Sequence, residues 1–299
     1  MSEQLVLTDS LFSIDEPLTE VSVTRWRNGE LSNVRDKVAE EVPIAFVFNG
    51  VSHAVMLATP LDLEDFALGF SLSEGILRDK SDLYDIEVVN QTQGIELRLE
   101  IASECFAKLK ERRRNLVGRT GCGICGAESL EQALRLPQMD IPNRSAVSKP
   151  LSAKHIQAAF HAIQGKQTLQ QATGATHACA WVNAQGEVAL LREDVGRHNA
   201  MDKLIGALAK QENNRQENIR QENKAPKRPN HHDGFVLTSS RASVEMVQKV
   251  ATAGIQILAA ISAPTGLAVR VAEMYGVTLI GFLRDQQFVI YTHQHRVEF

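Results

Sequence analysis

Residues 235–283 read FVLTSSRASVEMVQKVATAGIQILAAISAPTGLAVRVAEMYGVTLIGFL, and this stretch indicates the fold class. It alternates three apolar runs, which are typical of buried strands, with two helical patterns. In chain order these lie at 235–238, 244–253, 255–261, 266–275 and 277–283. A strand–helix–strand–helix–strand order predicts right-handed crossovers and neighbouring parallel strands. We therefore expect an α/β fold, a sheet with flanking helices.

The composition of the 299-residue chain is that of a soluble globular protein, with 43% hydrophobic and 23% charged residues. A net charge of −4 provides no general basic field for nucleic acid or a membrane surface. The amino terminus is acidic and lacks the basic start and apolar run of a signal peptide, so we expect a cytoplasmic protein. Residues 250–269 carry no charge but contain Gln, Ser, Thr, Pro and Gly, and are too polar for a membrane span.

A β-hairpin is the clearest local prediction in the first part of the chain. Residues 1–40 are polar and weakly patterned. They precede two β-rich runs, 43–48 and 51–57, joined by Asn49-Gly50. Because both central residues of the tightest hairpin turns need positive φ, Asn-Gly between such runs is a strong hairpin signal.

A helix is predicted over 59–74, with Thr59 as its cap and Pro60 in its first turn, where proline misses no amide hydrogen bond. Further patterns predict alternating strands and helices along the rest of the chain. They are a strand at 95–101, a basic helix at 104–114, helices at 128–136 and after Ser152, hairpin strands at 178–182 and 187–191, and a helix at 199–209.

Residues 211–233 form one low-complexity segment, in which QEN recurs. The segment has almost nothing to bury, so it predicts a solvated loop or frayed helix inserted into the fold. We expect two domains: 1–140, a smaller region with the hairpin, helix and CxxC loop, and 141–299, the α/β domain with this insertion.

Cys122 and Cys125 lie in a glycine-rich loop, GRTGCGICG, just before a predicted helix. Thiolate is the reactive form of cysteine, and helix amino termini and nearby cations lower the thiol pKa. Several Lys and Arg residues precede the loop, and most of them fit a solvated helix face. Arg119, three residues before Cys122, is the cation that we expect to act on the thiol.

Three other interpretations of the cysteine pair fit the sequence less well. A structural zinc site needs four ligands, but Cys105 and Cys179 are isolated, and no metal site is expected. A thioredoxin-like motif would follow a strand, whereas a basic helix precedes this one. A zinc deaminase needs H-x-E, and none of the nine histidines has Glu two positions later. A nucleophilic or sulfur-carrying cysteine remains.

Residues 192–199, REDVGRHN, place five ionisable side chains around one glycine between a strand and a helix. Backbone amides at a helix start, together with Arg197, can bind an anion. An elaborate capping and salt-bridge cluster is the alternative, although five ionisable residues exceed what capping requires. His177 lies alone on a predicted strand, where a satisfied structural role is the better interpretation.

Two strand-to-helix loops of the α/β stretch offer hydroxyls, backbone amides and helix starts. One contains Ser239, Ser240 and Arg241, and the other contains Thr265 and Gly266. Serine and threonine cap most helices, so each loop is a weak signal. Two such loops on one sheet edge, with Arg241 present, predict a site for a nucleotide-like ligand.

Several long motifs follow one another along the chain: TPLDLEDFALGFSLSEG from 59, GRTGCGICG from 118, EDVGRHNAMDKLIG from 193, SSRASVEMVQK from 239, ISAPTGLAV from 261 and VTLIGFLR from 277. In this order they resemble the FdhD family of formate dehydrogenase accessory sulfurtransferases. The resemblance runs from about residue 20 to the end of the chain, with only 211–233 standing apart.

The resemblance implies a cytidine-deaminase-like α/β fold without deaminase activity. It also implies that a cysteine desulfurase delivers sulfur to Cys122 as a persulfide, with Cys125 assisting. The sulfur then passes to the molybdenum or tungsten of a bis(molybdopterin guanine dinucleotide) cofactor before its insertion into formate dehydrogenase. In this scheme the cofactor is a bound substrate and not a permanent cofactor of the protein. Whether the protein forms a homodimer is left open.

By position, one segment matches the guanine-dinucleotide-binding segment of the family. It consists of Phe282, Leu283, Arg284, Asp285, Gln286 and Gln287. This segment departs from the family pattern at Gln286 and Gln287, where other members carry a Gly-Arg pair. Two rival functions stay open: a cofactor-binding chaperone without sulfur transfer, and a zinc-binding interaction module.

Overall fold

The computed structural model describes residues 16–114, 150–221 and 234–299. A six-stranded sheet has the order β13-β12-β11-β10-β8-β9. Its strands are β8 (His177–Asn183), β9 (Val188–Asp194), β10 (Gly234–Thr238), β11 (Ile257–Ala260), β12 (Thr278–Gly281) and β13 (Val289–Ile290). The three strands predicted in the opening stretch are β10, β11 and β12, which pair in parallel as expected. The α/β class is confirmed.

Helices cover both faces of this sheet. They are α4 (Ala153–Lys166), α5 (Thr168–Thr173), α6 (Arg197–Gln221), α7 (Val244–Thr252) and α8 (Gly266–Tyr275). Side chains alternate between the faces of a strand. Val236 of β10 therefore packs in one core with α6, α7 and α8, while Leu237 packs in a second core with α4. The buried residues of α4 are Ile156, Ala159, Phe160 and Ile163, as the helical spacing predicted.

A separate four-stranded sheet has the order β4-β3-β6-β5. Its elements, with the two helices that accompany it, are β3 (Val42–Phe48), β4 (Val51–Ala58), β5 (Leu83–Gln91), β6 (Gly94–Ile101), α1 (Leu63–Ser73) and α2 (Ser103–Arg114). Asn49 and Gly50 have φ of 45° and 77°. The predicted hairpin, β3–β4, is confirmed at a turn with two positive φ angles.

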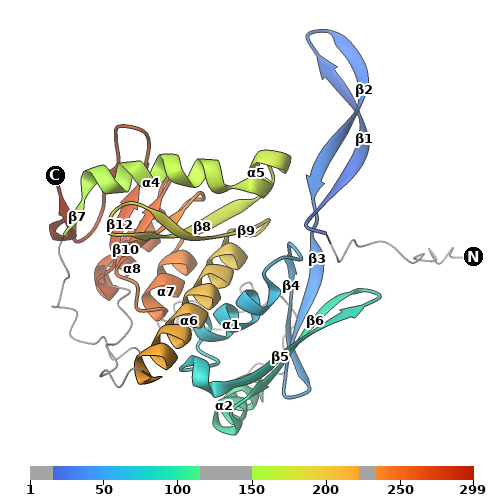
Figure 1. Cartoon of the computed structure of the whole chain (residues 1–299), viewed down its shortest axis with the longest axis vertical. Helices are drawn as coiled ribbons and strands as arrows, with labels where there is room; N and C mark the ends of the chain where they lie inside the picture. Colours follow the sequence, from blue (N-terminus) through green and yellow to red (C-terminus); the bar gives the residue numbers. More distant parts are fainter. Residues whose placement is uncertain (1–15, 115–149, 222–233) are drawn as a thin grey trace, which may run out of the picture.

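The first hairpin of the chain was not predicted. β1 (Leu18–Arg27) and β2 (Glu30–Ala39) form a two-stranded ribbon that extends away from the rest of the chain (Figure 1). Its turn is a second Asn-Gly pair, Asn28-Gly29, again with positive φ at both residues. None of its residues is fully buried, and this part of the chain was interpreted as polar and weakly patterned.

The carboxyl end of α6 also differs from the prediction. The helix was expected over 199–209 but runs from Arg197 to Gln221, so the start of the predicted insertion is helical. The CxxC loop, the helix predicted at 128–136 and the domain boundary at 140 lie outside the described residues. Short elements complete the fold: β7 (Leu151–Ser152) paired with β14 (Val297–Glu298), and the 3-10 helices η1 (Lys80–Asp82) and η2 (Gln294–Arg296).

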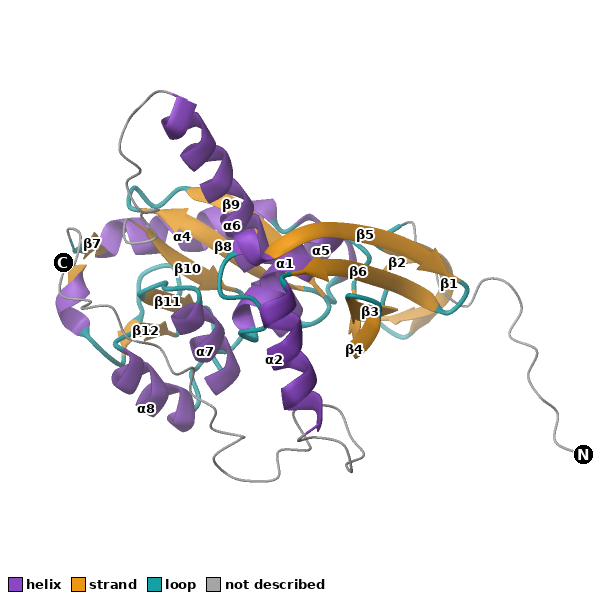
Figure 2. Cartoon of the chain, turned by 90° about the horizontal axis from the view of Figure 1, so that it is seen from below, coloured by secondary structure: helices purple, strands orange, loops and turns teal. Residues whose placement is uncertain are grey.

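Helices α1 and α6 cross closely and join the two sheets (Figure 2). A Cβ atom on Gly69 would overlap the backbone oxygen of Asp202, and one on Gly206 would overlap that of Asp65. Only glycine permits this approach at both positions. Along the described ranges, no helix combines the length and apolarity needed to cross a bilayer.

Candidate functional site

Helices α6, α7 and α8 all begin at the same edge of the six-stranded sheet, because β9, β10 and β11 run in one direction. The two predicted loops meet there. The Thr265 amide donates to the Ala242 oxygen at 3.0 Å, and Ala242 forms a parallel bridge with Pro264. Arg197, at the start of α6, lies at this edge too. The structure thus brings the predicted loops and Arg197 to one edge.

The hydroxyls of the first loop have structural partners. Ser239 Oγ accepts a hydrogen bond from the Ala178 amide at 2.8 Å. Ser240 Oγ lies 2.9 Å from Thr238 Oγ1, which also accepts from the Ser240 amide. Arg241 is exposed beside them. Of this loop, the Arg241 guanidinium is therefore the group most accessible to a ligand.

The second loop caps α8. Thr265 is the N-cap residue, and its Oγ1 accepts from the Ala268 amide at 3.3 Å. This hydroxyl therefore caps the helix, which is the common structural role of Thr that made the loop a weak signal for a ligand site. Gly266 follows as the first residue of the helix.

The segment from Phe282 to Gln287 follows β12 at the same edge. The Phe282 amide donates to the Ser262 oxygen at 3.3 Å, which places the segment beside the loop that precedes α8. Phe282 has a φ of 53° and is 41% exposed, whereas Leu283 is buried. A ring held outward by a left-handed backbone is available for stacking on a planar ligand.

The remaining residues of that segment form a surface turn. Arg284 donates to the carbonyl oxygens of Ile261 and Leu283. Asp285 Oδ1 lies 2.6 Å from His161 Nε2 on α4. Gln286 and Gln287 are exposed.

Most of the REDVGRHN motif is structural. Glu193 is buried and accepts from the amides of Leu169 and Gln170, at 3.0 and 2.8 Å, so it caps α5. Arg192 donates to Asp65 on α1 through Nε and Nη2 at 2.8 and 2.6 Å. For these residues the capping and salt-bridge alternative is the one that the structure supports.

Asp194 forms the centre of a buried cluster. It accepts from the Thr59 amide and from Lys203 Nζ, at 3.1 and 2.7 Å. The sequence predicted that Thr59 caps α1, but the structure does not show this. The N-cap residue is Asp62, and Thr59 Oγ1 instead accepts from the Val195 amide at 3.2 Å. The prediction was wrong because the chain turns once more, through Asp62 with a φ of 54°, before the helix begins.

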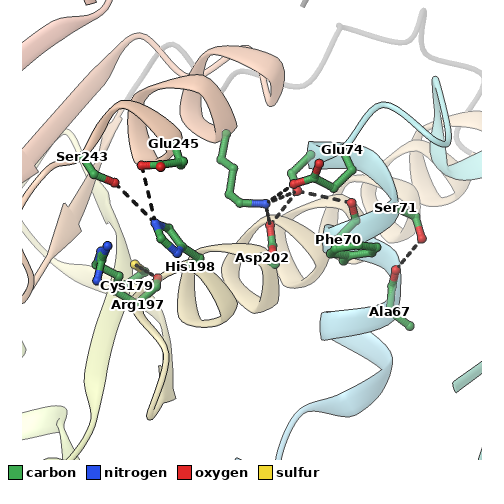
Figure 3. Close-up of polar contacts among 12 residues, drawn as sticks. Ala67, Phe70, Ser71, Glu74, Cys179, Arg197, His198, Asp202, Ser243 and Glu245 are labelled. Carbon is green, nitrogen blue, oxygen red and sulfur yellow. Dashed lines mark hydrogen bonds and ion pairs between the residues drawn. The ribbon is translucent and has the colours of Figure 1, made fainter. Parts of the chain in front are cut away.

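Arg197 and His198 are the residues of the motif that face the sheet edge. The Nε atom of Arg197 is buried and has no hydrogen-bond partner in the described part of the chain. His198 Nε2 lies 3.4 Å from Ser243 Oγ and 3.8 Å from Glu245 (Figure 3). Burial, followed by the charge of Arg197, lowers the pKa of His198 to about 4, so the imidazole is neutral at physiological pH.

A second buried network was missed in the sequence. Lys249 of α7 lies 2.9 Å from Asp202 of α6 and 2.8 Å from Glu74, at the end of α1 (Figure 3). Ser73 Oγ donates to Asp202 at 2.6 Å. In the sequence, the only signal was that Lys249 and Asp202 each lie on the apolar face of a predicted helix. This does not show that the two side chains contact each other.

Two of the four cysteines are unsuited to sulfur transfer. Cys179 is fully buried, and burial raises its thiol pKa to about 12. Cys105 is also buried, and burial again raises the pKa. Cys122 and Cys125 lie outside the described residues. Within the described ranges, no group of three or more His, Cys, Asp or Glu side chains could hold a metal ion.

Comparison with known families and structures gives consistent matches. A sequence model of the FdhD/NarQ family matches residues 39–298. The chain is 57% identical to the sulfur carrier protein FdhD of Cupriavidus necator over 277 residues, covering 93% of this chain and 89% of the relative. It is 50% identical to the protein of the same name from Bordetella petrii over 281 residues, covering 93% of each chain.

A solved structure shares the fold. It was described as that of a formate dehydrogenase accessory protein from Desulfotalea psychrophila, and it matches with a TM-score of 0.68 at 20% identity. The match covers 95% of this chain and all of that chain.

Proposed function

Because this chain belongs to the FdhD/NarQ family, we propose that it is a sulfur carrier required for formate dehydrogenase activity. The observation that carries the proposal is the extent of the likeness to relatives named sulfur carrier proteins, which reaches 57% identity over 93% of this chain. A sulfurtransferase activity follows from this role. The similar structure described as a formate dehydrogenase accessory protein supports the fold on which the proposal relies.

The distribution of cysteines supports Cys122 or Cys125 as the carrier. The chain has four cysteines, and two of them are buried with raised thiol pKa values. Only a thiolate attacks sulfur efficiently. In the loading step, the Cys122 thiolate attacks the outer sulfur of a persulfide on a cysteine desulfurase. A new sulfur–sulfur bond forms on Cys122, and the desulfurase cysteine leaves as a thiolate.

The acceptor that we propose is the molybdenum or tungsten of a bis(molybdopterin guanine dinucleotide) cofactor, bound as a substrate. Arg197 and Arg241 provide positive charge for its phosphates at the sheet edge. The exposed ring of Phe282 is suited to stacking on one of its planar rings. We also propose that the α/β fold is cytidine-deaminase-like and that formate dehydrogenase is the partner that receives the cofactor.

Mass spectrometry after incubation with a cysteine desulfurase and cysteine tests the proposal. The wild type should gain one sulfur atom, and Cys122→Ala should gain none. Cys179→Ala is the matched control and should load like the wild type, since Cys179 is fully buried. Formate dehydrogenase activity in cells that carry only Cys122→Ala should be lost. Full activity there would favour a cofactor-binding chaperone that does not transfer sulfur.

A further inference from the structure

The outer half of the β1–β2 ribbon packs against nothing else in the described part of the chain. Residues 24–33, which include the turn, are all exposed, and the ribbon extends away from both sheets (Figure 1). An isolated two-stranded hairpin is at best marginally stable in water. This half of the ribbon therefore offers both of its faces to another macromolecule.

The tip of the ribbon carries an apolar pair. Trp26 and Leu31 lie opposite each other on the two strands, next to the turn, and are 70% and 72% exposed. Tryptophan is mostly buried in folded proteins, and it is among the residues most enriched at the energetic centres of protein interfaces. The pair suits an apolar pocket on a partner protein.

One cation beside this pair is also available. Two arginines of the ribbon form ion pairs within it, Arg25 with Asp36 at 3.8 Å and Arg35 with Glu20 at 3.5 Å. Arg27, which follows Trp26, takes part in no ion pair within the described ranges. The complementary pocket should therefore have a carboxylate at its rim.

The base of the ribbon lies at the edge of the six-stranded sheet where the cofactor is proposed to bind. Shortly after β2, Val42 pairs with Ala58 of β4. The oxygen of Leu57, the residue before Ala58, accepts from Asn199 Nδ2 at 2.9 Å, in the first turn of α6. Because α6 begins at that edge, these contacts fix the base of the ribbon beside it.

Helix α5 provides a second connection to the same edge. β2 contacts α5, and the chain passes from α5 into β8. Cys179, near the start of β8, pairs with Thr238, the last residue of β10. The ribbon therefore projects from the side of the molecule where the cofactor would enter and leave.

The segment with Cys122 starts from another part of the molecule. It continues from α2, which ends at Arg114. Along the longest dimension of the molecule, α2 lies at one end and the ribbon at the other (Figure 1). The ribbon is thus better placed for a protein that meets the cofactor edge than for one that delivers sulfur to the cysteines.

We propose that the outer half of the ribbon, with Trp26 at its centre, docks the apoenzyme that receives the cofactor. This inference rests on the proposed function, under which that enzyme is formate dehydrogenase. The ribbon holds the apoenzyme against the edge from which the cofactor is released. It precedes residue 39, where the match to the family model begins, so it is an addition to the part of the chain that defines the family.

Biolayer interferometry with the full chain and purified formate dehydrogenase, taken from cells that cannot make the cofactor, tests the inference. Trp26→Ala should weaken binding at least about thirtyfold, as loss of a central interface aromatic does. Trp26→Phe should retain part of the affinity. Tyr84→Ala is the matched control, because Tyr84 is also 70% exposed but lies on β5, and it should bind like the wild type. Unchanged affinity in Trp26→Ala, or no binding by the wild type, would overturn the inference.

Arg27→Ala tests the carboxylate at the rim of the partner's pocket. It should weaken binding about two- to fivefold at low salt, and less at high salt, because exposed charge pairs are weak and screened. Full affinity of this variant at low salt would contradict an acidic rim.

Light scattering and persulfide loading on the same preparations distinguish other partners. Trp26→Ala should keep the molecular mass of the wild type and should load sulfur on Cys122 normally. A change of mass with unchanged apoenzyme affinity would assign the ribbon to a second copy of this chain. A loss of loading with unchanged apoenzyme affinity would assign it to the desulfurase. Either result would overturn the inference.

The loading measurement also separates this inference from the proposed function. If the wild type loads sulfur but Trp26→Ala binds the apoenzyme as the wild type does, only the role of the ribbon is rejected. If the wild type does not load sulfur but binds the apoenzyme through Trp26, the sulfur-carrier role is rejected and the docking role stays.

Discussion

Lys203 and Asp194 form an ion pair in which both side chains are completely buried, with 2.7 Å between Nζ and Oδ2. Lys203 Nζ also donates to the Thr59 oxygen at 2.9 Å. The pair therefore connects the start of α6 and the end of β9 to the segment before α1. Burial lowers the pKa of Lys203, while the charge of Asp194 opposes that shift.

Asp194→Asn should destabilise the protein by about 3–5 kcal/mol, because it leaves the Lys203 charge buried without a partner. Urea unfolding followed by circular dichroism measures the loss. Asp85→Asn, at an exposed position of β5, is the control and should change stability by less than about 0.5 kcal/mol. A loss below about 1 kcal/mol in Asp194→Asn would show that the pair is unimportant for stability.

Gly206→Ala should destabilise by about 1–3 kcal/mol, because the new methyl group meets the Asp65 backbone and forces α1 and α6 apart. Gly165→Ala is the matched control. It lies in α4 with open space around its Cβ position, so alanine should stabilise the helix by about 0.5–1 kcal/mol. Opposite signs for the two substitutions are the expected result, and equal effects would argue against the close helix crossing.

His198 should make the protein less stable in mild acid. Its pKa is about 4 in the folded state and near 6.5 when unfolded, so the unfolded state binds the proton first as pH falls. The contribution is fully present above pH 6.5 and is lost towards pH 4. Because the side chain is partly exposed, we expect a loss of about 1–2 kcal/mol between pH 7 and pH 5.

Urea unfolding at several pH values, with wild type and His198→Gln, isolates this contribution. Arg197, Glu245, Lys249 and Glu74 also face the imidazole, and their charges are present in both proteins. The difference in stability between the two proteins should therefore shrink as pH falls. A constant difference from pH 7 to pH 5 would mean that His198 does not titrate in this range.

Arg241→Ala should weaken binding of guanosine diphosphate about ten- to a hundredfold, as loss of one charge-assisted phosphate contact does. Persulfide loading of Cys122 should be unaffected, since loading needs only the thiolate and its donor. Arg98→Ala removes the same charge from an exposed position of β6, in the other sheet, and is the control in calorimetric titration. Equal affinity in the wild type and Arg241→Ala would remove Arg241 from the site.

The two Asn-Gly turns show how far local patterns reach. Asn49-Gly50 was recognised because it joins two β-rich runs, 43–48 and 51–57. Asn28-Gly29 has the same turn geometry, but no residue of its strands is fully buried, and the sequence there is polar and weakly patterned. A hairpin that packs against little else leaves only its turn residues as a signal.

The REDVGRHN motif shows the opposite limit. Its charges were visible in the sequence, but Glu193 caps a helix more than twenty residues earlier and Asp194 binds Lys203 and the Thr59 amide. The same residue types would suit an anion site or a salt-bridge cluster. Only their three-dimensional partners distinguish these, and those partners assign Glu193 and Asp194 to the scaffold.

Strand and helix periods, turns and the parallel order of β10, β11 and β12 were readable in the amino-acid sequence, because each depends on residues close together in the chain. The long motifs likewise identified the family without coordinates. The α1–α6 crossing at Gly69 and Gly206, and the buried ion pair of Lys203 with Asp194, arise where distant segments pack together. Such contacts depend on the packing of the whole chain, which no local period encodes.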